Sequence, residues 1–270
     1  MSRPIIRWAG SKRSIAKQLI NRIPSSYGLY VEPFCGSAAL YYELGEKRAL
    51  LNDLNSKLIN FYRHFQDEPG QLYDIISNIP VDKSSYYHIR NQFNSDISPV
   101  DEAAYFYFLN RNCFNGLYRT CKSGRFNVPY SESRNGRIHD RNEFISISAK
   151  LNKAQFSNYD FELCIRENLS DETFFFIDPP YAINYREPFA EYGSNVFGPK
   201  DIERVISCLR MIDERKGKFL FTYDHRLKNI FEIDSSWRIS EINVRRNIAG
   251  FADQRKNAKE LIISNFQIEE

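Results

Sequence analysis

The DPPY sequence at positions 178–181 suggests chemistry more directly than any other part of the chain. It follows an apolar run, and a strand that ends in a turn explains most isolated Asp-Pro pairs, because proline cannot donate a hydrogen bond to a strand ladder. An acid at such a corner also suits one particular reaction. The exocyclic amine of a nucleobase is a poor nucleophile, and groups that accept its hydrogens favour the tetrahedral nitrogen that develops as a methyl group arrives.

Each residue of this corner has a role in that reaction. The carboxylate of Asp178 and the carbonyl of Pro179 could accept the two amine hydrogens. Pro179 and Pro180 would fix the direction of these groups, and the ring of Tyr181 offers a surface on which a base can stack. The corner therefore predicts methyl transfer to a planar amine, with Asp178, Pro179, Pro180 and Tyr181 as catalytic residues.

A second candidate site lies near the start of the chain. The sequence VEPFCG at positions 31–36 reads as a strand that ends in a turn of small residues before a helix, and Asp53 follows seventeen residues after Gly36. An acid at the end of the next strand suits the hydroxyls of a ribose. The turn lacks the G-x-G-x-x-G pattern, so a purely structural turn is an equal alternative.

The elements that must position these residues predict an α/β fold. We expect a helix over residues 11–23 with Ser11 or Ser14 as its cap, strands near residues 29–32, 48–53, 154–161, 173–178 and 218–224, and an antiparallel strand pair after residue 236. This order predicts a Rossmann-like sheet with helices on both faces. Residues 57–150 read as an inserted, mainly helical domain with a hairpin, so that residues 1–56 and 151–270 form the catalytic, cofactor-binding domain.

The charge is unevenly distributed on a chain whose net charge is only +3. Residues 111–141 hold seven Arg or Lys against two acids, and residues 238–259 hold six against two. Two separated basic stretches suggest that an anionic partner is contacted from two sides. The alternative is that both stretches are ordinary charged surface in contact with water.

Several classes of site are excluded by the composition. The five cysteines form no C-x-x-C pair and the four histidines are scattered, so we expect no metal site and no disulfide framework. No G-x-S-x-G elbow is present. The chain has no run of about twenty apolar residues and no signal sequence at its start, and we expect a cytoplasmic protein.

Four motifs taken together resemble the Dam-type DNA adenine methyltransferases. They are RWAGSK at 7–12, VEPFCG at 31–36, NDLN at 52–55 and DPPY at 178–181, in the order of that family. The segment LNRNCFNGLYR…SGRFNVPY resembles its target-recognition stretch, and the tail RRNIAG…RKNAKELIISN is also similar. The resemblance implies transfer of a methyl group from S-adenosylmethionine to the 6-amino group of a flipped adenine in double-stranded DNA. It also implies direct transfer without a metal, by a monomer that could accompany a cognate restriction endonuclease.

The resemblance further implies which residues hold the cofactor. Lys12 would bind its carboxylate and Asp53 its ribose hydroxyls. Glu32, Phe34 and Gly36 would line its methionine side, and the pair Asp160 and Phe161 would lie beside its adenine ring. The full set is Trp8, Lys12, Glu32, Phe34, Gly36, Asp53, Asp160, Phe161 and Asp178. Trp8 and Phe34 could instead be core aromatics and Lys12 a solvated helix residue.

For DNA, the resemblance makes Arg119 the residue that reads a base edge, because a guanidinium can donate twice to guanine in the major groove. Phe114 would fill the gap left by an extruded base, or could simply pack a helix. Arg111 and Asn115 match positions suited to phosphates, Leu117 and Pro129 positions near a thymine methyl, and Asn127 completes the set. The FNGLYR match predicts a GATC or GATC-like site and leaves the outer base pairs open.

Two alternatives remain at the level of the sequence. One is a DNA-binding module of the same fold without catalysis. The other is an amino-methyltransferase that acts on another planar amine, such as a glutamine amide, because such an amine presents the same problem of a delocalised lone pair.

Overall fold

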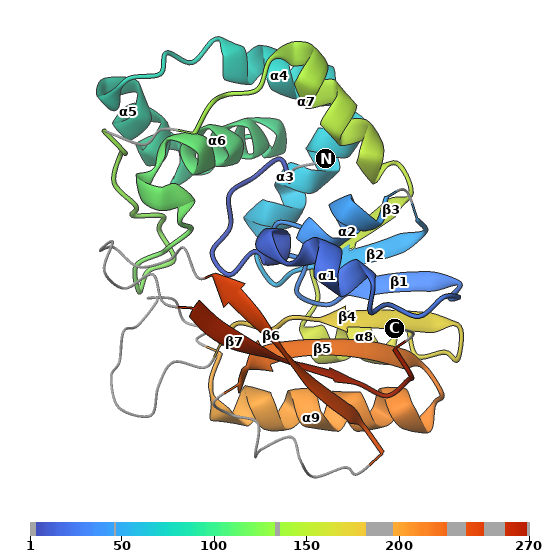
Figure 1. The fold of residues 1–270 in the computed structure, drawn as a ribbon. Coiled ribbons are helices and arrows are strands. Elements are labelled where there is room, and N and C mark those ends of the chain that lie inside the picture. Colours follow the sequence, from blue (N-terminus) through green and yellow to red (C-terminus); the bar gives the residue numbers. More distant parts are fainter. Residues whose placement is uncertain are drawn as a thin grey trace.

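The structure is a computed structural model that describes residues 4–45, 47–132, 136–181, 197–225, 236–245 and 257–268. Its centre is a seven-stranded sheet with the strand order β3-β2-β1-β4-β5-β7-β6 (Figure 1). The strands are β1 Leu29–Glu32, β2 Ala49–Asn52, β3 Ala154–Ser157, β4 Thr173–Ile177, β5 Lys218–Asp224, β6 Arg238–Arg245 and β7 Asn257–Ser264.

Strands β1 to β5 are parallel, and β7 pairs antiparallel with both β5 and β6. The chain runs from β1 outward to β2 and β3, and later returns to place β4 on the other side of β1. Ligands bind in α/β sheets at the carboxyl ends of the strands where the strand order reverses in this way. The expected α/β sheet with an antiparallel pair at its C-terminal end is thus the fold observed.

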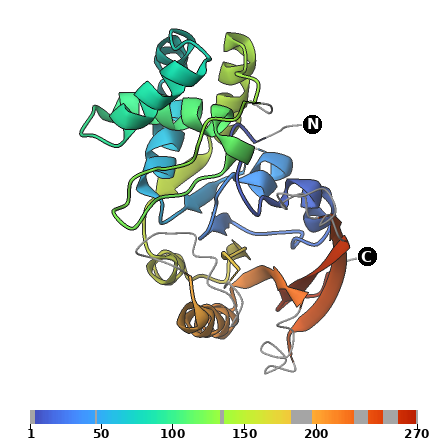
Figure 2. The same cartoon turned by 90° about the vertical axis from the view of Figure 1, so that its left-hand side faces the viewer.

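Both faces of the sheet are covered, and the central strand β4 is therefore almost entirely apolar. All residues of β4 are buried, as is typical of a parallel strand between two layers of helices. On one face lie α1 (Ala16–Ile20) and α2 (Ala39–Leu44), and on the other lie α8 (Phe161–Arg166) and α9 (Pro199–Glu214) (Figure 2). Alternate residues of one strand therefore enter different cores, with Phe174 on the first face and Phe175 on the second.

Five helices follow β2 and precede β3, at one end of the sheet (Figure 1). They are α3 Ser56–Asp67, α4 Pro69–Ser77, α5 Lys83–Phe93, α6 Pro99–Asn112 and α7 Arg141–Ser148. Four of them begin at a polar side chain that accepts a hydrogen bond from a backbone N–H of the first turn, namely Asn55, Asp82, Ser98 and Asp140. Their aromatic side chains, including Phe61 and Phe106, belong to the same hydrophobic cluster as the first face of the sheet.

The helix expected over residues 11–23 is wrong in its bounds and in its cap. The structure has a short 3-10 turn, η1 (Lys12–Ser14), followed by α1, and neither begins with a side-chain cap. Ser11 Oγ lies 2.7 Å from Ser37 Oγ, in the turn after β1. The sequence pattern failed here because both Ser11 and Lys12 are bonded to the ends of distant strands rather than to their own helix.

The stretch predicted to be a hairpin forms no regular strands in the structure. It contains two isolated antiparallel bridges, Cys113 to Tyr130 and Thr120 to Phe126. Two further 3-10 turns are η2 Phe114–Gly116 and η3 Ala149–Leu151. Of the tail motifs, residues 246–250 of RRNIAG and the first two residues of RKNAKELIISN, 255 and 256, lie outside the described residues. Within the described ranges, no helix is long and apolar enough to span a membrane, and no three metal-ligating side chains are grouped.

Candidate active site

The ends of β1, β2 and β4 bring three acids to one edge of the sheet. Glu32 ends β1, Asp53 directly follows β2, and Asp178 directly follows β4. The side chain of Asn52 ties two neighbouring strand ends to β2, because its Nδ2 donates to the carbonyls of Pro33 and Tyr159 at 2.9 and 3.0 Å. The edge predicted from the sequence is therefore held together by buried polar bonds.

The turn after β1 needs glycine at position 36. Gly36 has φ +46, and a Cβ at this position would lie 2.7 Å from Trp8 Cδ1. Its N–H donates to Asp53 Oδ2 at 3.0 Å, and the N–H of Asn55 donates to the other oxygen of Asp53 at 2.9 Å. Burial raises the pKa of Asp53, and these two backbone donors oppose that rise. Trp8, Gly36 and Asp53 are thus brought together as one wall of the site.

Asp178 occupies a polar corner that stays open to solvent. Its Oδ1 lies 2.7 Å from Lys12 Nζ and accepts a hydrogen bond from Thr222 Oγ1 at 2.8 Å. The ion pair with Lys12 and the hydrogen bond from Thr222 both engage Oδ1, and 16% of the side chain is exposed. Burial raises the pKa of Asp178, while the ammonium of Lys12 opposes that rise. A carboxylate with one anchored oxygen and one available oxygen can act as a fixed acceptor.

Lys12 is not the solvated helix residue that remained an alternative, because only 6% of its side chain is exposed. Its ammonium also lies 3.3 Å from Glu260 Oε1 and donates to the Tyr181 hydroxyl at 3.2 Å. Burial disfavours this charge, but Asp178 and Glu260 outweigh burial and raise the pKa of Lys12. The Tyr181 hydroxyl in turn donates to Glu260. We refer to Lys12, Asp178, Tyr181 and Glu260 as the acidic corner.

Glu32 is buried and bonded within the protein. Its Oε1 accepts hydrogen bonds from the Tyr30 hydroxyl at 2.6 Å and from the N–H of Tyr41 at 3.1 Å. The second bond satisfies a donor in the first turn of α2, where Ala38 offers no capping side chain. Burial raises the pKa of Glu32 to about 8, against the lowering effect of these two bonds.

An aromatic wall forms beside α8. The rings of Phe34 and Phe161 lie 5.0 Å apart. Phe161 is covered by the guanidinium of Arg204 at 4.5 Å. Asp160 caps α8 and is paired with the same Arg204. The sequence placed Asp160 and Phe161 together but did not indicate that an arginine of α9 holds both.

Residues 113–130, which we call the exposed segment, carry most of the residues assigned to DNA. Phe114 is 46% exposed, Asn115 has a left-handed backbone with φ 54, and the N–H of Phe114 donates to the carbonyl of Pro129 at 2.9 Å. Leu117 is half-buried. Since nearly half of the Phe114 ring is in solvent, the alternative of a helix-packing aromatic is not supported.

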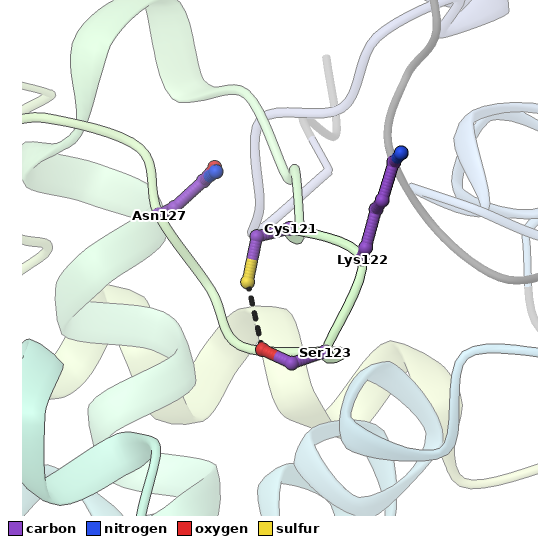
Figure 3. Close-up of a pocket in the computed structure, with 4 residues that line it drawn as sticks. All are labelled: Cys121, Lys122, Ser123 and Asn127. Carbon is purple, nitrogen blue, oxygen red and sulfur yellow. Dashed lines mark hydrogen bonds between the residues drawn. The ribbon is translucent and has the colours of Figure 1, made fainter.

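Arg119 and Asn127 face each other across the exposed segment. Arg119 Nε donates to Asn127 Oδ1 at 2.9 Å, and the two backbones are joined by a 3.1 Å hydrogen bond. Asn127 also lines a cavity of about 550 Å³ with Cys121, Lys122 and Ser123 (Figure 3). None of these lining residues belongs to the acidic corner.

Arg111, the remaining residue assigned to DNA, is half-buried. Its Nε donates to the carbonyl of Arg137 at 2.9 Å, so that its guanidinium fastens the chain near residue 137. Burial lowers the pKa of Arg111. The structure therefore gives Arg111 a partner inside the protein, which its assignment to a phosphate did not anticipate.

The sequence reasoning also missed three residues of the site, namely Thr222, Glu260 and Arg204. Thr222 and Glu260 are polar residues inside the apolar stretches KFLFTYD and ELIIS. A polar residue at an inward position of a buried strand needs a partner, and that signal could have marked both. Arg204 stands in an ordinary amphipathic helix and carries no such signal.

The matching family model and the related proteins are all described as methyltransferases or methylases. Residues 8–248 match the model of a family described as D12 class N6 adenine-specific DNA methyltransferase. The chain is 32% identical to the type II methyltransferase M1.LlaDCHI of Lactococcus lactis subsp. cremoris, over 98% of this chain and 95% of that protein. It is 29% identical to the type II methyltransferase M.MjaIII of Methanocaldococcus jannaschii, over 98% and 99% of the two chains. A DNA adenine methylase of Haemophilus influenzae is 28% identical to it, over 96% of this chain and 92% of that protein.

Proposed function

The chain belongs to the D12 class of N6 adenine-specific DNA methyltransferases, and from this premise we propose that it transfers a methyl group from S-adenosylmethionine to the 6-amino group of an adenine extruded from double-stranded DNA. The family is one of enzymes, which speaks against the alternative of a binding module without catalysis. The observation that carries the proposal is the geometry of Asp178. This carboxylate is anchored through one oxygen and partly open to solvent, and it directly precedes Pro179 and Pro180.

In the proposed reaction, the chain's own residues orient and polarise the amine. Asp178 Oδ2 and the carbonyl of Pro179 each accept one amine hydrogen, which favours a tetrahedral nitrogen with its lone pair directed away from both. Pro180 keeps the corner rigid and lacks an N–H that would compete for the acceptors. The face of the Tyr181 ring supports the base, while its hydroxyl is tied to Lys12 and Glu260.

The residues at the sheet edge fit S-adenosylmethionine. When bound, this cofactor supplies a methyl group that is activated by a positively charged sulfur. The carboxylates of Asp178 and Glu260 share the single ammonium of Lys12, so one negative charge remains beside the corner to favour a cationic ligand. Asp53 has accepted one backbone hydrogen on each oxygen and keeps lone pairs for the ribose hydroxyls.

The remaining cofactor contacts follow from the same edge. We propose that Trp8 and Gly36 form the wall next to Asp53, that Glu32, Phe34 and Gly36 line the methionine side, and that Asp160 and Phe161 lie beside the cofactor's adenine ring. Lys12 would reach the cofactor's carboxylate only by leaving Asp178 or by being shared with it, since its ammonium lies 2.7 Å from Asp178 in the structure.

For DNA, we propose that the exposed segment enters the major groove. Arg119 would read a guanine and Asn127 would hold its guanidinium in plane, while Phe114 would occupy the space of the extruded adenine. Leu117 and Pro129 would contact a thymine methyl, and Asn115 a phosphate. Residues 57–150 would act as the target-recognition domain on a catalytic domain of residues 1–56 and 151–270. A GATC or GATC-like site, a monomeric enzyme and a partner restriction endonuclease complete the proposal.

The test is a transfer assay on unmethylated double-stranded DNA with methyl-labelled S-adenosylmethionine. After digestion to nucleosides, we expect the label in N6-methyldeoxyadenosine. Label in a cytosine derivative would contradict the proposed amine. If DNA received no label and a polypeptide substrate did, the alternative of another planar amine would replace the proposal.

A further inference from the structure

Glu260 is a buried acid of β7 to which the family resemblance assigned no individual role and which takes no direct part in the proposed methyl transfer. It precedes the buried residues Leu261, Ile262 and Ile263 on β7 and is itself only 5% exposed. Burying a carboxylate is costly unless it is paired and hydrogen-bonded. The position of Glu260 therefore requires an explanation from its contacts.

Glu260 contacts Lys12 and Tyr181, two residues close to Asp178 in the acidic corner. Glu260 Oε1 lies 3.3 Å from the ammonium of Lys12, which lies 2.7 Å from Asp178. The same Oε1 accepts a hydrogen bond from the Tyr181 hydroxyl. Its second oxygen, Oε2, is buried and has no hydrogen-bond partner among the described residues. One side chain from β7 thus touches both neighbours that flank the proposed amine acceptor.

We propose that Glu260 is a positioning residue of the transfer reaction, which shares Lys12 with Asp178 and anchors the Tyr181 hydroxyl, so that Asp178 remains a strong acceptor for the amine. This inference rests on the proposed function, because it assigns a role within the same site.

The electrostatic part of the role follows from a count of charges. Lys12 is the only cation within contact distance of Asp178 in the described part of the chain, and without Glu260 its attraction would act on Asp178 alone. A neighbouring positive charge weakens a carboxylate as a hydrogen-bond acceptor. The weakening is smaller when a second negative charge offsets the positive one. Glu260 supplies that compensation from the opposite side of Lys12, and its charge favours a higher pKa of Asp178, in the same direction as burial.

The other charged groups around Glu260 do not replace it. Asp224 of β5 stands opposite Glu260 in the antiparallel register and is buried, with His225 at 3.6 Å from its carboxylate. Glu32 of β1 also acts on Asp178 electrostatically. Ile242 of β6 faces Glu260 from the other side and carries no charge. Glu260 contacts both Lys12 and Tyr181.

The geometric part of the role concerns the Tyr181 ring. The Tyr181 and Tyr223 rings are nearly perpendicular, with a centroid distance of 5.2 Å and an interplanar angle of 82°. The Tyr181 hydroxyl is held by Glu260 and by Lys12, and the Lys12 ammonium lies 5.1 Å from the centroid of the Tyr181 ring. The orientation of the ring is therefore fixed by Tyr223, Lys12 and Glu260 together. Loss of the Glu260 contact would free the hydroxyl end.

The first experiment compares the wild type with Glu260→Gln, using Glu241→Gln as the control. Glu241 is an acid on the neighbouring strand β6 that pairs with Lys259 outside the acidic corner. For Glu260→Gln we expect kcat to fall about ten- to a hundredfold, as loss of a hydrogen bond to a charged group predicts. We also expect the acid limb of the kcat/KM profile for DNA to move to lower pH, because Asp178 would then lose its proton more easily.

A second readout does not depend on activity. In the ligand-free protein labelled with ¹³C at the aspartate carboxyls, the Asp178 signal, identified with Asp178→Asn, should titrate at lower pH in Glu260→Gln and at an unchanged pH in Glu241→Gln. An unchanged titration of Asp178 together with unchanged kcat in Glu260→Gln would overturn the proposal. A wild type that transfers no methyl group to DNA would instead overturn the proposed function.

A third variant covers the case in which Glu260→Gln does not fold. Glu260→Asp keeps the charge but withdraws the carboxylate from Tyr181. We expect its acid limb to stay near that of the wild type while kcat falls, with the KM for cofactor unchanged. A Glu260→Asp variant with wild-type kcat would contradict the positioning role.

Discussion

The acidic corner and the exposed segment differ in how deeply their polar and aromatic side chains are buried. In the corner, the side chains of Lys12, Asp178 and Glu260 are at least four-fifths buried and bonded to one another. In the exposed segment, Phe114 and Arg119 are exposed to solvent, and they are held by backbone hydrogen bonds and by one hydrogen bond from Arg119 to Asn127. A group that must act on a reacting atom profits from a fixed position, whereas a group that must meet a partner's surface has to remain accessible.

The difference also separates the expected consequences of mutation. Changes in the acidic corner should reduce the rate of transfer and leave DNA affinity nearly intact. Changes in the exposed segment should alter which DNA is chosen and leave the chemistry on the best site nearly intact.

The largest effect is expected for Asp178→Ala. Removal of the amine acceptor should lower the rate of methyl transfer about a thousandfold, since loss of one preorganised group of this kind costs about 10²–10³ in kcat and Lys12 is left facing the site. DNA affinity, measured by fluorescence anisotropy, should stay within a few-fold of the wild type. Asp171→Asn, in the turn before β4, serves as control. Substantial turnover by Asp178→Ala would refute the role of this carboxylate.

A large effect on stability and cofactor binding is expected for Gly36→Ala. The new Cβ would require both a left-handed backbone and a displacement of Trp8, and we expect a loss of about 2–4 kcal/mol in the free energy of unfolding. Gly45→Ala is a matched control, because Gly45 has φ +84 but no atom within 4 Å of the added Cβ.

The comparison of these two glycine variants isolates the contact with Trp8. Gly45→Ala should lose about 1–2 kcal/mol of stability from backbone strain alone. Calorimetry with S-adenosylmethionine should show weaker binding for Gly36→Ala only. Equal cofactor affinity in both variants would remove Trp8 and Gly36 from the proposed cofactor site.

A smaller effect, confined to specificity, is expected for Arg119→Ala. The variant should lose about 1–3 kcal/mol of discrimination between the best duplex and duplexes with one base pair changed. Methylation rates on such a set of duplexes measure this directly, with Arg210→Ala on α9 as control. If Arg119→Ala lowered all rates equally, Arg119 would contact phosphate and not a base edge.

The last prediction concerns stability alone, through its dependence on pH. The pKa of Glu32 is raised from 4.5 to about 8 in the folded protein. Between these values the folded state holds a proton that the unfolded state releases, so stability falls as pH rises through this window, by at most about 1.4 kcal/mol per pH unit. Glu32→Gln can still accept both hydrogen bonds on its amide oxygen, and its stability should depend less on pH.

Denaturant titrations at pH 5, 6.5 and 8 measure this dependence. The exposed acid Glu203 on α9 provides the control variant Glu203→Gln, which should follow the wild type. An identical pH dependence in Glu32→Gln and the wild type would mean that Glu32 is ionised in the folded protein despite its burial.

The positions of Asp53 and Asp178 at the carboxyl ends of the strands could be predicted from local sequence. Apolar strands followed directly by Asp53 or Asp178 place these acids at the carboxyl edge whenever the strands are parallel, and the structure has parallel strands there. The small-residue turn at Gly36 was predicted in the same way. Lys12 and Asp178 were both assigned to the site, but their direct pairing was not predicted.

The parts that could not be predicted depend on strand order and register. Glu260 reaches Lys12 because β7 is placed next to β5, and no local pattern specifies that neighbour. Ser11 was expected to cap a helix and instead contacts Ser37, because the turn after β1 lies beside it. Arg111 was expected to face DNA and is bonded to the backbone of Arg137. In each case the side chain contacts a residue that is distant in the sequence, and the local sequence pattern does not specify that contact.

The central claim is tested most directly by sequencing for modified adenines after the protein and S-adenosylmethionine have acted on genomic DNA that carries no adenine methylation. The account predicts N6-methyladenine at every copy of one short sequence, GATC or closely related to it, and at few other adenines. Methylation spread evenly over all adenines would contradict the role of the exposed segment, and DNA without modified adenine would contradict the role of the acidic corner.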